Sequence, residues 1–176
     1  MIKSVLVSKP FKDFAYIKKL YDSSFPRNER IPFMRLYRQL DESHVFYAYY
    51  DNDEFIGLSF LFLHGSIAYL SYLAVKPEFR NQGYGGQILE LIKQQYATFT
   101  IVIDIEEAEA ASPNYEERVQ RRAFYLRHGF TSSSVFYSIF NVDYELLSFN
   151  GTITAQQWQQ LITAFWGKYA RLAQYH

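Results

Sequence analysis

The chain has 176 residues, enough for one domain with a substantial hydrophobic core. It has no cysteine, which excludes disulfide frameworks, thiolate catalysis and cysteine-ligated metal sites. Its 18 basic and 18 acidic residues balance, so charge indicates no nucleic-acid partner and no anionic membrane partner. The 16 tyrosines and 16 phenylalanines are the unusual feature, and we expect most of these rings to pack in the core.

Neither a membrane span nor a metal site is expected. No uncharged stretch approaches the roughly 20 residues that a membrane span needs, and the N-terminal apolar run is too short for a signal peptide. We therefore expect a cytoplasmic protein. The four histidines lie far apart with no pair at helical spacing, so the sequence predicts no histidine-based zinc site.

In the first half of the chain, apolar periodicity and turn residues predict one strand, two helices and then three strands. Asp51, Asn52 and Asp53 separate the first two of these three strands, and Gly65 with Ser66 separates the last two, as in an antiparallel meander. The predicted ranges are 2–8 for the first strand, 11–25 and 33–40 for the helices, and 45–51, 54–65 and 66–75 for the meander.

The second half continues with a helix after a glycine-rich segment, and then a strand, a helix, two strands and a final helix. The predicted ranges are 98–106 for the strand, 115–128 for a helix that ends at Gly129, and 130–140 and 142–149 for the strand pair. Thr154 precedes Gln157 by three residues, which is the spacing of a capping box at the start of the final helix. The order β-α-α-β-β-β-α-β-α-β-β-α predicts a mixed α/β fold.

The segment 69–96, YLSYLAVKPEFRNQGYGGQILELIKQQY, leads from an apolar strand into a glycine-rich loop and an amphipathic helix. Arg80, Gly83 and Gly85 form Arg-x-x-Gly-x-Gly, and Gly86 follows directly. Glycines allow backbone N–H groups to converge on an anion, and the helix dipole adds positive charge behind them. The pattern therefore predicts a pyrophosphate-binding loop.

Two common nucleotide-binding motifs do not fit this loop. A Walker-type loop would need Lys-Ser or Lys-Thr after the glycines, and a dinucleotide fingerprint would need Gly-x-Gly-x-x-Gly. The strand ending Leu-Ala-Val, the Lys-Pro that follows it, Arg-x-x-Gly-x-Gly and the helix instead resemble the acetyl-CoA loop of the GNAT N-acetyltransferase superfamily.

A second segment carries the same resemblance. Residues 122–130, RAFYLRHGF, resemble the GNAT signature Ala-x-x-Tyr-x-x-x-Gly-Phe, with Tyr125 two residues after Ala123 and Gly129-Phe130 beyond it. The likeness spans about Ile2 to Phe149. It implies the GNAT fold, a central, mostly antiparallel mixed sheet with helices on both faces. We expect residues 1–150 to form the acetyltransferase domain and 151–176 to be a helical extension packed on it.

The resemblance implies acetyl-CoA as co-substrate and no metal. In the family a backbone N–H on the strand before the loop holds the thioester carbonyl, which corresponds here to Leu73 to Val75. Gln120 occupies the position of a frequent family asparagine. The residues that the resemblance assigns to the cofactor are Leu73, Ala74, Val75, Arg80, Asn81, Gln82, Gly83, Tyr84, Gly85, Gly86 and Gln120.

Tyr125 matches the family's general acid, and a phenol with a pKa of about 10 can protonate a leaving thiolate. The glutamate that many relatives carry on the strand before the loop is missing, since residues 68–72 are Ala, Tyr, Leu, Ser and Tyr. Glu106 and Glu107, at the end of the next strand, are the nearest candidates for a general base. Alternatively, they begin a solvated acidic loop with Glu109.

In this family the segment between the first two helices helps to choose the acceptor. Here Glu29 is expected to hold a cationic amine, with Phe25 and Phe33 as apolar walls. The sequence thus predicts transfer of an acetyl group from acetyl-CoA to a primary amine, favouring a small molecule, by direct attack in a ternary complex. The alternatives are a protein or peptide acceptor, and a non-catalytic acyl-CoA-binding sensor. The final helix is a candidate homodimer surface.

Overall fold

The computed structural model describes residues 1–27 and 30–176. Its strands are β1 (Lys3–Leu6), β2 (His44–Asp51), β3 (Glu54–His64), β4 (Ile67–Val75), β5 (Thr100–Glu106), β6 (Thr131–Ile139), β7 (Val142–Phe149) and β8 (Gln174–Tyr175). Its α-helices are α1 (Phe14–Ser24), α2 (Phe33–Arg38), α3 (Tyr84–Gln95), α4 (Tyr115–Arg127) and α5 (Ala155–Trp166). Two short 3-10 segments are η1 (Pro77–Phe79) and η2 (Gly167–Leu172).

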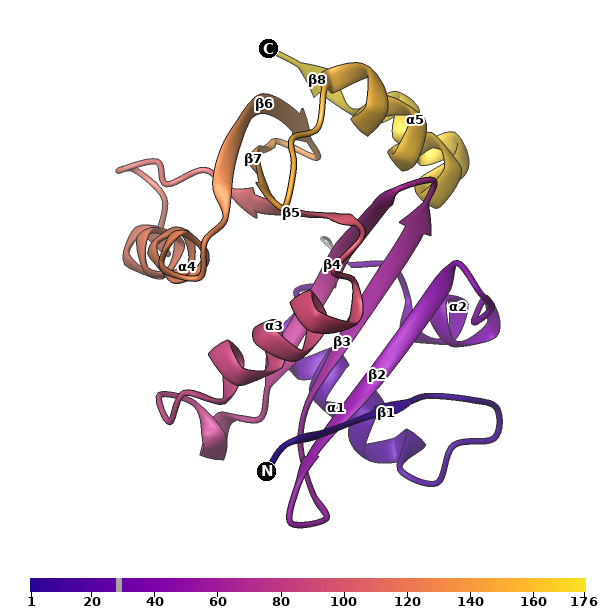
Figure 1. The fold of residues 1–176 in the computed structure, drawn as a ribbon. Helices are drawn as coiled ribbons and strands as arrows, with labels where there is room; N and C mark the ends of the chain where they lie inside the picture. The colour runs from indigo at the N-terminus through magenta and orange to yellow at the C-terminus, as the bar shows by residue number, and fades with distance from the viewer. Residues whose placement is uncertain (28–29) are drawn as a thin grey trace. The chain divides into compact units, whose positions relative to one another are not determined.

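The predicted order of strands and helices is confirmed, and β8, η1 and η2 are additions that the sequence did not indicate. The fold is mixed α/β with mostly antiparallel strands, as expected (Figure 1). Residues Met1–Tyr96 and Ala97–His176 form two compact units, each described by itself below. The division into residues 1–150 and 151–176 stays a prediction. No helix in the described ranges is long and apolar enough to cross a membrane.

The first unit is a four-stranded antiparallel sheet in the order β1-β2-β3-β4. Asn52 and Asp53 join β2 to β3 and have positive φ angles of 47° and 65°. Two successive residues with positive φ make a tight turn whose twist matches that of the flanking strands. Asn and Asp tolerate this conformation better than other non-glycine residues, so the turn is specified locally.

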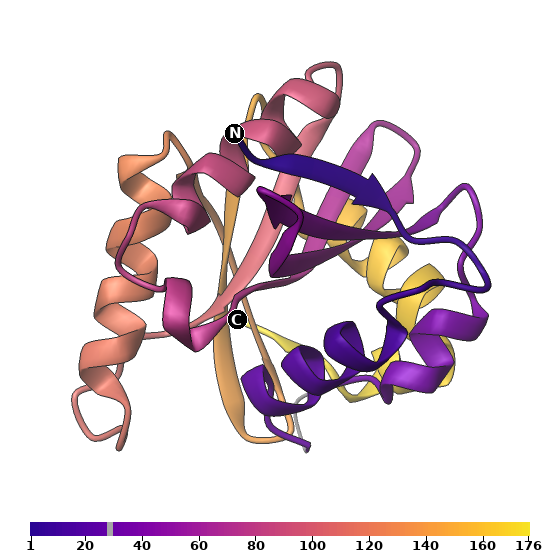
Figure 2. The same cartoon turned by 90° about the horizontal axis from the view of Figure 1, so that it is seen from below.

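The two faces of this sheet carry different helices (Figures 1 and 2). Phe46, Phe60 and Tyr72 lie on one face, where Phe46 contacts the ring of Phe33 in α2 and Tyr72 contacts Tyr21 in α1. Side chains alternate along a strand, so the neighbouring residues of β2 and β3 face α3 on the other side. This arrangement accounts for many of the aromatic residues: they form the core between the sheet and the two N-terminal helices.

Gly57 in β3 allows α3 to approach the sheet closely. A Cβ at this position would lie 2.6 Å from the carbonyl oxygen of Ala74 in β4 and 3.1 Å from Cδ1 of Ile88 in α3. Any side chain here would push α3 or β4 away. Because α3 begins at the glycine-rich loop, Gly57 contributes to the placement of that loop.

The second unit pairs its strands antiparallel in the order β5-β7-β6-β8. Phe140 and Asn141, with φ angles of 52° and 61°, form the tight turn between β6 and β7. The Trp158 ring of α5 lies 5.5 Å from the Tyr137 ring of β6, so α5 packs on this sheet. The capping box predicted at the start of α5 is present. Thr154 accepts a hydrogen bond from the Gln157 N–H at 3.2 Å, and the Gln157 side chain accepts one from the Thr154 N–H at 2.9 Å.

Candidate functional site

The glycine-rich segment of the first unit ends in an uncapped helix N-terminus. Gly83 is the N-cap of α3 with a φ of 81°, and neither a capping side chain nor an acidic residue occupies the first turn. The first intrahelical bond runs from the Gln87 N–H to the Gly83 carbonyl at 3.2 Å. The N–H groups of Tyr84, Gly85 and Gly86 therefore precede the helical ladder and can bind an anion.

Open space surrounds Gly83, since a Cβ there would have no heavy atom within 4 Å. Glycine is needed for its backbone conformation, because a positive φ strains any residue with a side chain. The loop residue Asn81 also has a positive φ, at 61°. A glycine-capped helix start that is open and has no acidic residue in its first turn suits a pyrophosphate, so this part of the chain fits acetyl-CoA.

Side chains on both sides of the loop hold it in place. The Arg80 Nε donates to the Val75 carbonyl at 3.1 Å, and the Gln82 side chain donates to the Glu78 carbonyl at 2.8 Å. The Tyr84 hydroxyl donates to the Asp51 carboxylate at 2.9 Å, and this bond raises the pKa of Tyr84. The loop is thus attached both to the end of β4 and to the end of β2.

A β-bulge in β4 precedes the loop. Tyr72 pairs with Phe60 and Leu70 with Leu61, so Ser71 is an extra residue in β4. After the bulge, Leu73 and Val75 pair with Ser59 and Gly57, which places them on the face that α3 covers. Bulges redirect a strand and are common beside active sites. The sequence did not predict this one, although Ser71 interrupts an apolar run and was the available signal.

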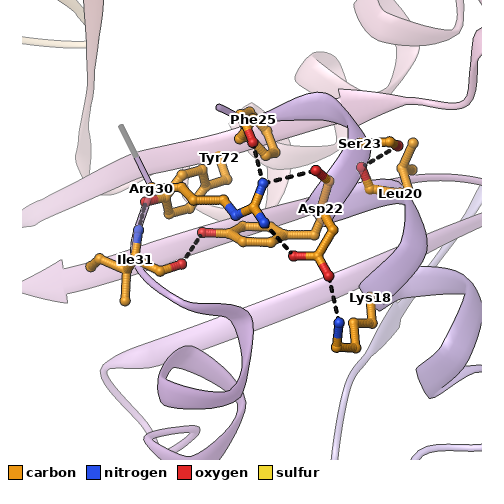
Figure 3. Close-up of polar contacts among 9 residues, drawn as sticks. Lys18, Leu20, Asp22, Ser23, Phe25, Arg30, Ile31 and Tyr72 are labelled. Carbon is orange, nitrogen blue, oxygen red and sulfur yellow. Dashed lines mark hydrogen bonds and ion pairs between the residues drawn. The ribbon is translucent and has the colours of Figure 1, made fainter. Parts of the chain in front are cut away.

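Of the predicted acceptor residues, Phe25 directly follows α1 (Figure 3), and Phe33 is the first residue of α2. Phe25 is half-buried, with its ring 5.2 Å from that of Tyr21 and 4.9 Å from that of Tyr72. Phe33 is only 4% exposed, packed among rings of α1, α2 and β2, so it offers little surface to an acceptor. Glu29 lies outside the described residues. The acceptor roles of these three residues stay predictions.

In the second unit, Tyr125 lies on α4 with its ring against Phe124 and Phe130. Burial raises the pKa of Tyr125 to about 12, with a smaller lowering by the charge of Arg121 and a raising by Asp104. Its hydroxyl makes no hydrogen bond to any residue in the described ranges. The phenol is therefore protonated at neutral pH and remains able to donate a proton. Asp104, which bonds the Tyr137 hydroxyl at 2.6 Å, was not singled out from the sequence.

Glu106 and Glu107 have different surroundings despite being adjacent. Glu106 is buried, and its two carboxylate oxygens pair with Arg118 at 2.9 Å and with Arg121 at 2.7 Å. The Glu107 side chain is 33% exposed, and its carboxylate lies 3.9 Å from His176 Nε2. Desolvation, followed by the charge of Asp143, raises the pKa of Glu107. Of the two, Glu107 is the better placed to accept a proton.

A second buried carboxylate lies under α4. Glu145 of β7 accepts hydrogen bonds from Arg122 at 2.7 Å and 3.2 Å. Arg121 and Arg122 of α4 thus both pair with carboxylates of the sheet. Gln120 is exposed on α4, and its cofactor role stays a prediction. Within residues 1–27 and 30–176, no group of three or more His, Asp or Glu residues is arranged to hold a metal ion.

Comparison with known proteins gives a family and a set of similar folds. Residues 41–132 match the family model described as an acetyltransferase (GNAT) domain. A GNAT-family protein from Bacteroides thetaiotaomicron has a similar structure, with 23% identity, a TM-score of 0.79, and coverage of 94% of this chain and 98% of that one. The comparison with curated proteins found no match.

Two further structures share the fold but differ in the substrates that their names state. The ribosomal-protein-S18-alanine N-acetyltransferase from Escherichia coli is 16% identical with a TM-score of 0.63, covering 89% of this chain and 97% of that one. Mutant forms of the spermidine/spermine N-acetyltransferase from Vibrio cholerae are 14% identical with a TM-score of 0.64, covering 85% and 94%. Similarity at this level establishes the fold alone, so it does not decide between a protein and a polyamine acceptor.

Proposed function

Because this chain belongs to the GNAT family of acetyltransferases, and is an acetyl-CoA-dependent N-acetyltransferase, we propose that its acceptor is the primary amine of a small molecule. The observation that carries the cofactor half of this proposal is the start of α3 at Gly83, which has a positive φ and no capping side chain. The half-buried Phe25 ring makes a T-shaped contact with Tyr72 and supports the acceptor half, because aromatic rings bind cationic amines.

The first requirement of the reaction is a site for the donor. We assign the diphosphate of acetyl-CoA to the N–H groups of Tyr84, Gly85 and Gly86, and the thioester carbonyl to a backbone N–H between Leu73 and Val75. Acetyl-CoA supplies the activated acyl group, and the protein orients it. Backbone donors of this kind need no reorganisation as negative charge develops on the carbonyl oxygen.

Proton transfer is the second requirement. The amine must lose a proton before or as it attacks the thioester carbon, and the departing sulfur must gain one. We assign the first task to Glu107, directly or through a water, because its pKa is raised and no guanidinium group binds its carboxylate among the described residues. We assign the second task to Tyr125, whose phenol is protonated and makes no hydrogen bond in the described part of the chain.

A protein or peptide acceptor is the alternative, and the likeness to the Escherichia coli ribosomal-protein enzyme supports it. The two alternatives differ in the size of the acceptor, so substrate length discriminates between them. A small amine fits between a few side chains, whereas a peptide needs an extended contact surface beyond its terminal amine.

The proposal is tested by thiol release from acetyl-CoA with a panel of polyamines, amino acids, aminoglycosides and N-terminal peptides. Mass spectrometry of the acceptor then identifies the acetylated nitrogen. We expect kcat/KM for at least one small amine to exceed that for every peptide. Turnover confined to peptides would replace the small-molecule acceptor with a protein acceptor.

A further inference from the structure

Arg30 caps the C-terminal end of α1 from the segment that follows it (Figure 3). Its guanidinium pairs with the Asp22 carboxylate at 2.8 Å and donates to the Asp22 carbonyl at 2.8 Å and to the Phe25 carbonyl. The last carbonyls of a helix lack intrahelical partners and carry partial negative charge. The last turn of α1 has no basic residue of its own, so Arg30 supplies the cation. Its side chain is only 10% exposed.

The residue after Arg30 is held through its backbone. The Ile31 carbonyl accepts a hydrogen bond from the Tyr21 hydroxyl at 2.8 Å, and the Ile31 N–H donates to the Tyr72 hydroxyl at 2.9 Å. Tyr21 is in α1, whereas Tyr72 is in β4 next to the bulged Ser71. Burial raises the pKa of Tyr21 above its ordinary value, so this phenol remains a donor. One residue thus joins the segment to a helix and to the strand that leads to the acetyl-CoA loop.

Arg30 and Tyr72, the two anchoring residues, also contact Phe25, whose ring we assign to acceptor binding. The Phe25 carbonyl is bound by Arg30, and the Phe25 ring lies 4.9 Å from the Tyr72 ring. The position of the Phe25 ring therefore depends on both Arg30 and Tyr72. Neither anchoring group has to touch the acceptor for this dependence to exist.

We propose that Arg30 and Tyr72 are positioning residues that hold residues 25–27 and 30–32 in one conformation and thereby set the selectivity of the enzyme among acceptor amines. This inference rests on the proposed function. When the segment is ordered before the acceptor binds, acceptor binding does not include the free-energy cost of ordering the segment. Removing an anchor adds that cost to acceptor binding. The loss falls on acceptor binding, because the loop that binds acetyl-CoA has its own attachments to Val75 and Asp51.

Two substitutions remove the anchors in different ways. Tyr72→Phe keeps the ring that packs against Phe25 but removes the oxygen that the Ile31 N–H needs. Arg30→Lys keeps the charge but lacks the planar set of donors that serves one carboxylate and two carbonyls together. Arg27→Lys, in the same segment, and Tyr16→Phe, on α1, are matched controls at exposed positions.

The experiment measures hydrogen exchange and kinetics on the same five full-length proteins. Exchange is followed by mass spectrometry in peptides that cover residues 22–33, and KM is determined separately for acetyl-CoA and for two amines of different size. For Tyr72→Phe and Arg30→Lys we expect faster exchange in those peptides and an acceptor KM raised by about tenfold, with a changed ratio of kcat/KM between the two amines. The KM for acetyl-CoA and both controls should match the wild type.

Several outcomes would overturn the proposal. Unchanged exchange in both variants would show that Arg30 and Tyr72 do not fix the segment. Faster exchange with an unchanged ratio between the amines would show that the fixed conformation does not set selectivity. Failure of the proposed function is distinguishable from these, because it appears as an absence of small-amine turnover in the wild type, whereas exchange in the variants is measured without any substrate.

Discussion

Glu106 and Glu107 show how two adjacent residues of one type acquire different chemistry. The carboxylate of Glu106 is shared by two arginines of α4, so it serves to attach that helix to β5. Glu107 is more exposed than Glu106, and among the described residues no guanidinium group binds its carboxylate. Desolvation raises the pKa of Glu107. A raised pKa makes a carboxylate a stronger base at neutral pH.

Replacing each glutamate separates these roles. Glu107→Gln should lower kcat/KM by roughly 10²–10⁴ and remove the acidic limb of the pH–rate profile, because the base must be deprotonated to act. In the wild type that limb should lie above the ordinary glutamate pKa, since the pKa of Glu107 is raised.

Glu106→Gln should instead lower stability, because it leaves Arg118, 12% exposed, without its full charge partner. Parallel pH–rate and urea-unfolding measurements check both, and an acidic limb that persists in Glu107→Gln would exclude it as the base.

Tyr125→Phe tests the general acid. Removing the phenol should reduce kcat by roughly 10–10⁴ with little change in the affinity for acetyl-CoA. Because the pKa of Tyr125 is raised to about 12, wild-type kcat should show no alkaline decline from this group below about pH 11. Tyr16→Phe, at an exposed position, is the control. A kcat for Tyr125→Phe within twofold of the wild type would assign Tyr125 to packing.

At the scale of single residues, the sequence indicated candidate site residues but not the side chains that contact them. The glycines and Tyr125 could be singled out because their motifs are local and their spacing is fixed, and their roles stay predictions. The sequence left Glu106 and Glu107 equivalent, since their difference depends on arginines of α4, 12 to 15 residues further along the chain. The anchoring role of Arg30 was likewise hidden, because it depends on carbonyls and phenols rather than on a residue pattern.

Among the elements, α4 is attached to its sheet in large part by ion pairs. None of its residues is fully buried, yet it carries Tyr125. Its attachment to the sheet therefore relies on Arg118 and Arg121 with Glu106, and on Arg122 with Glu145. Burial alone would raise the pKa of Glu145, but hydrogen bonds from Arg122 and Ser132 outweigh it, and the net pKa is lowered.

Arg122→Met should therefore destabilise the protein in a pH-dependent way. A carboxyl with a lowered pKa stabilises the fold above its ordinary value near 4.5, and this contribution is lost as the pH falls through its folded-state pKa. We expect a loss of about 1–3 kcal/mol at pH 7, less than for a fully buried pair because the Arg122 side chain is 41% exposed. The difference from the wild type should shrink below about pH 4. Urea unfolding at several pH values measures it, with Arg127→Met as control; a pH-independent difference would contradict the account.

Features with a local sequence signature were predicted from the sequence, whereas features that depend on pairing between distant residues were not. The tight turn at Asn52-Asp53 and the capping box of α5 have local signatures and are confirmed. The two-residue strand β8 exists only because Gln174 and Tyr175 meet β6. The bulge at Ser71 is likewise a property of the pair β3 and β4, so neither strand alone specifies it.

For the molecule as a whole, the family and the fold are established while the acceptor is a proposal. Proteins that share this fold have names that state acceptors as different as a ribosomal-protein alanine and a polyamine. The acceptor is therefore set by a few side chains on a common framework, which is why fold similarity is uninformative about it. The predicted homodimer surface on α5 also stays a prediction.

Calorimetric titration of acetyl-CoA into the wild type and three glycine variants tests the central claim most directly. Gly83→Ala adds backbone strain alone, whereas Gly83→Asp adds no more strain than alanine, since Asp tolerates a positive φ better, and adds a negative charge at the proposed diphosphate site. Gly65→Asp places that charge on a turn glycine of similar φ, at 59°. We predict that Gly83→Asp binds acetyl-CoA at least about tenfold more weakly than Gly83→Ala, with Gly65→Asp equal to the wild type. Equal affinities for the two Gly83 variants would contradict the assignment of the diphosphate to the start of α3.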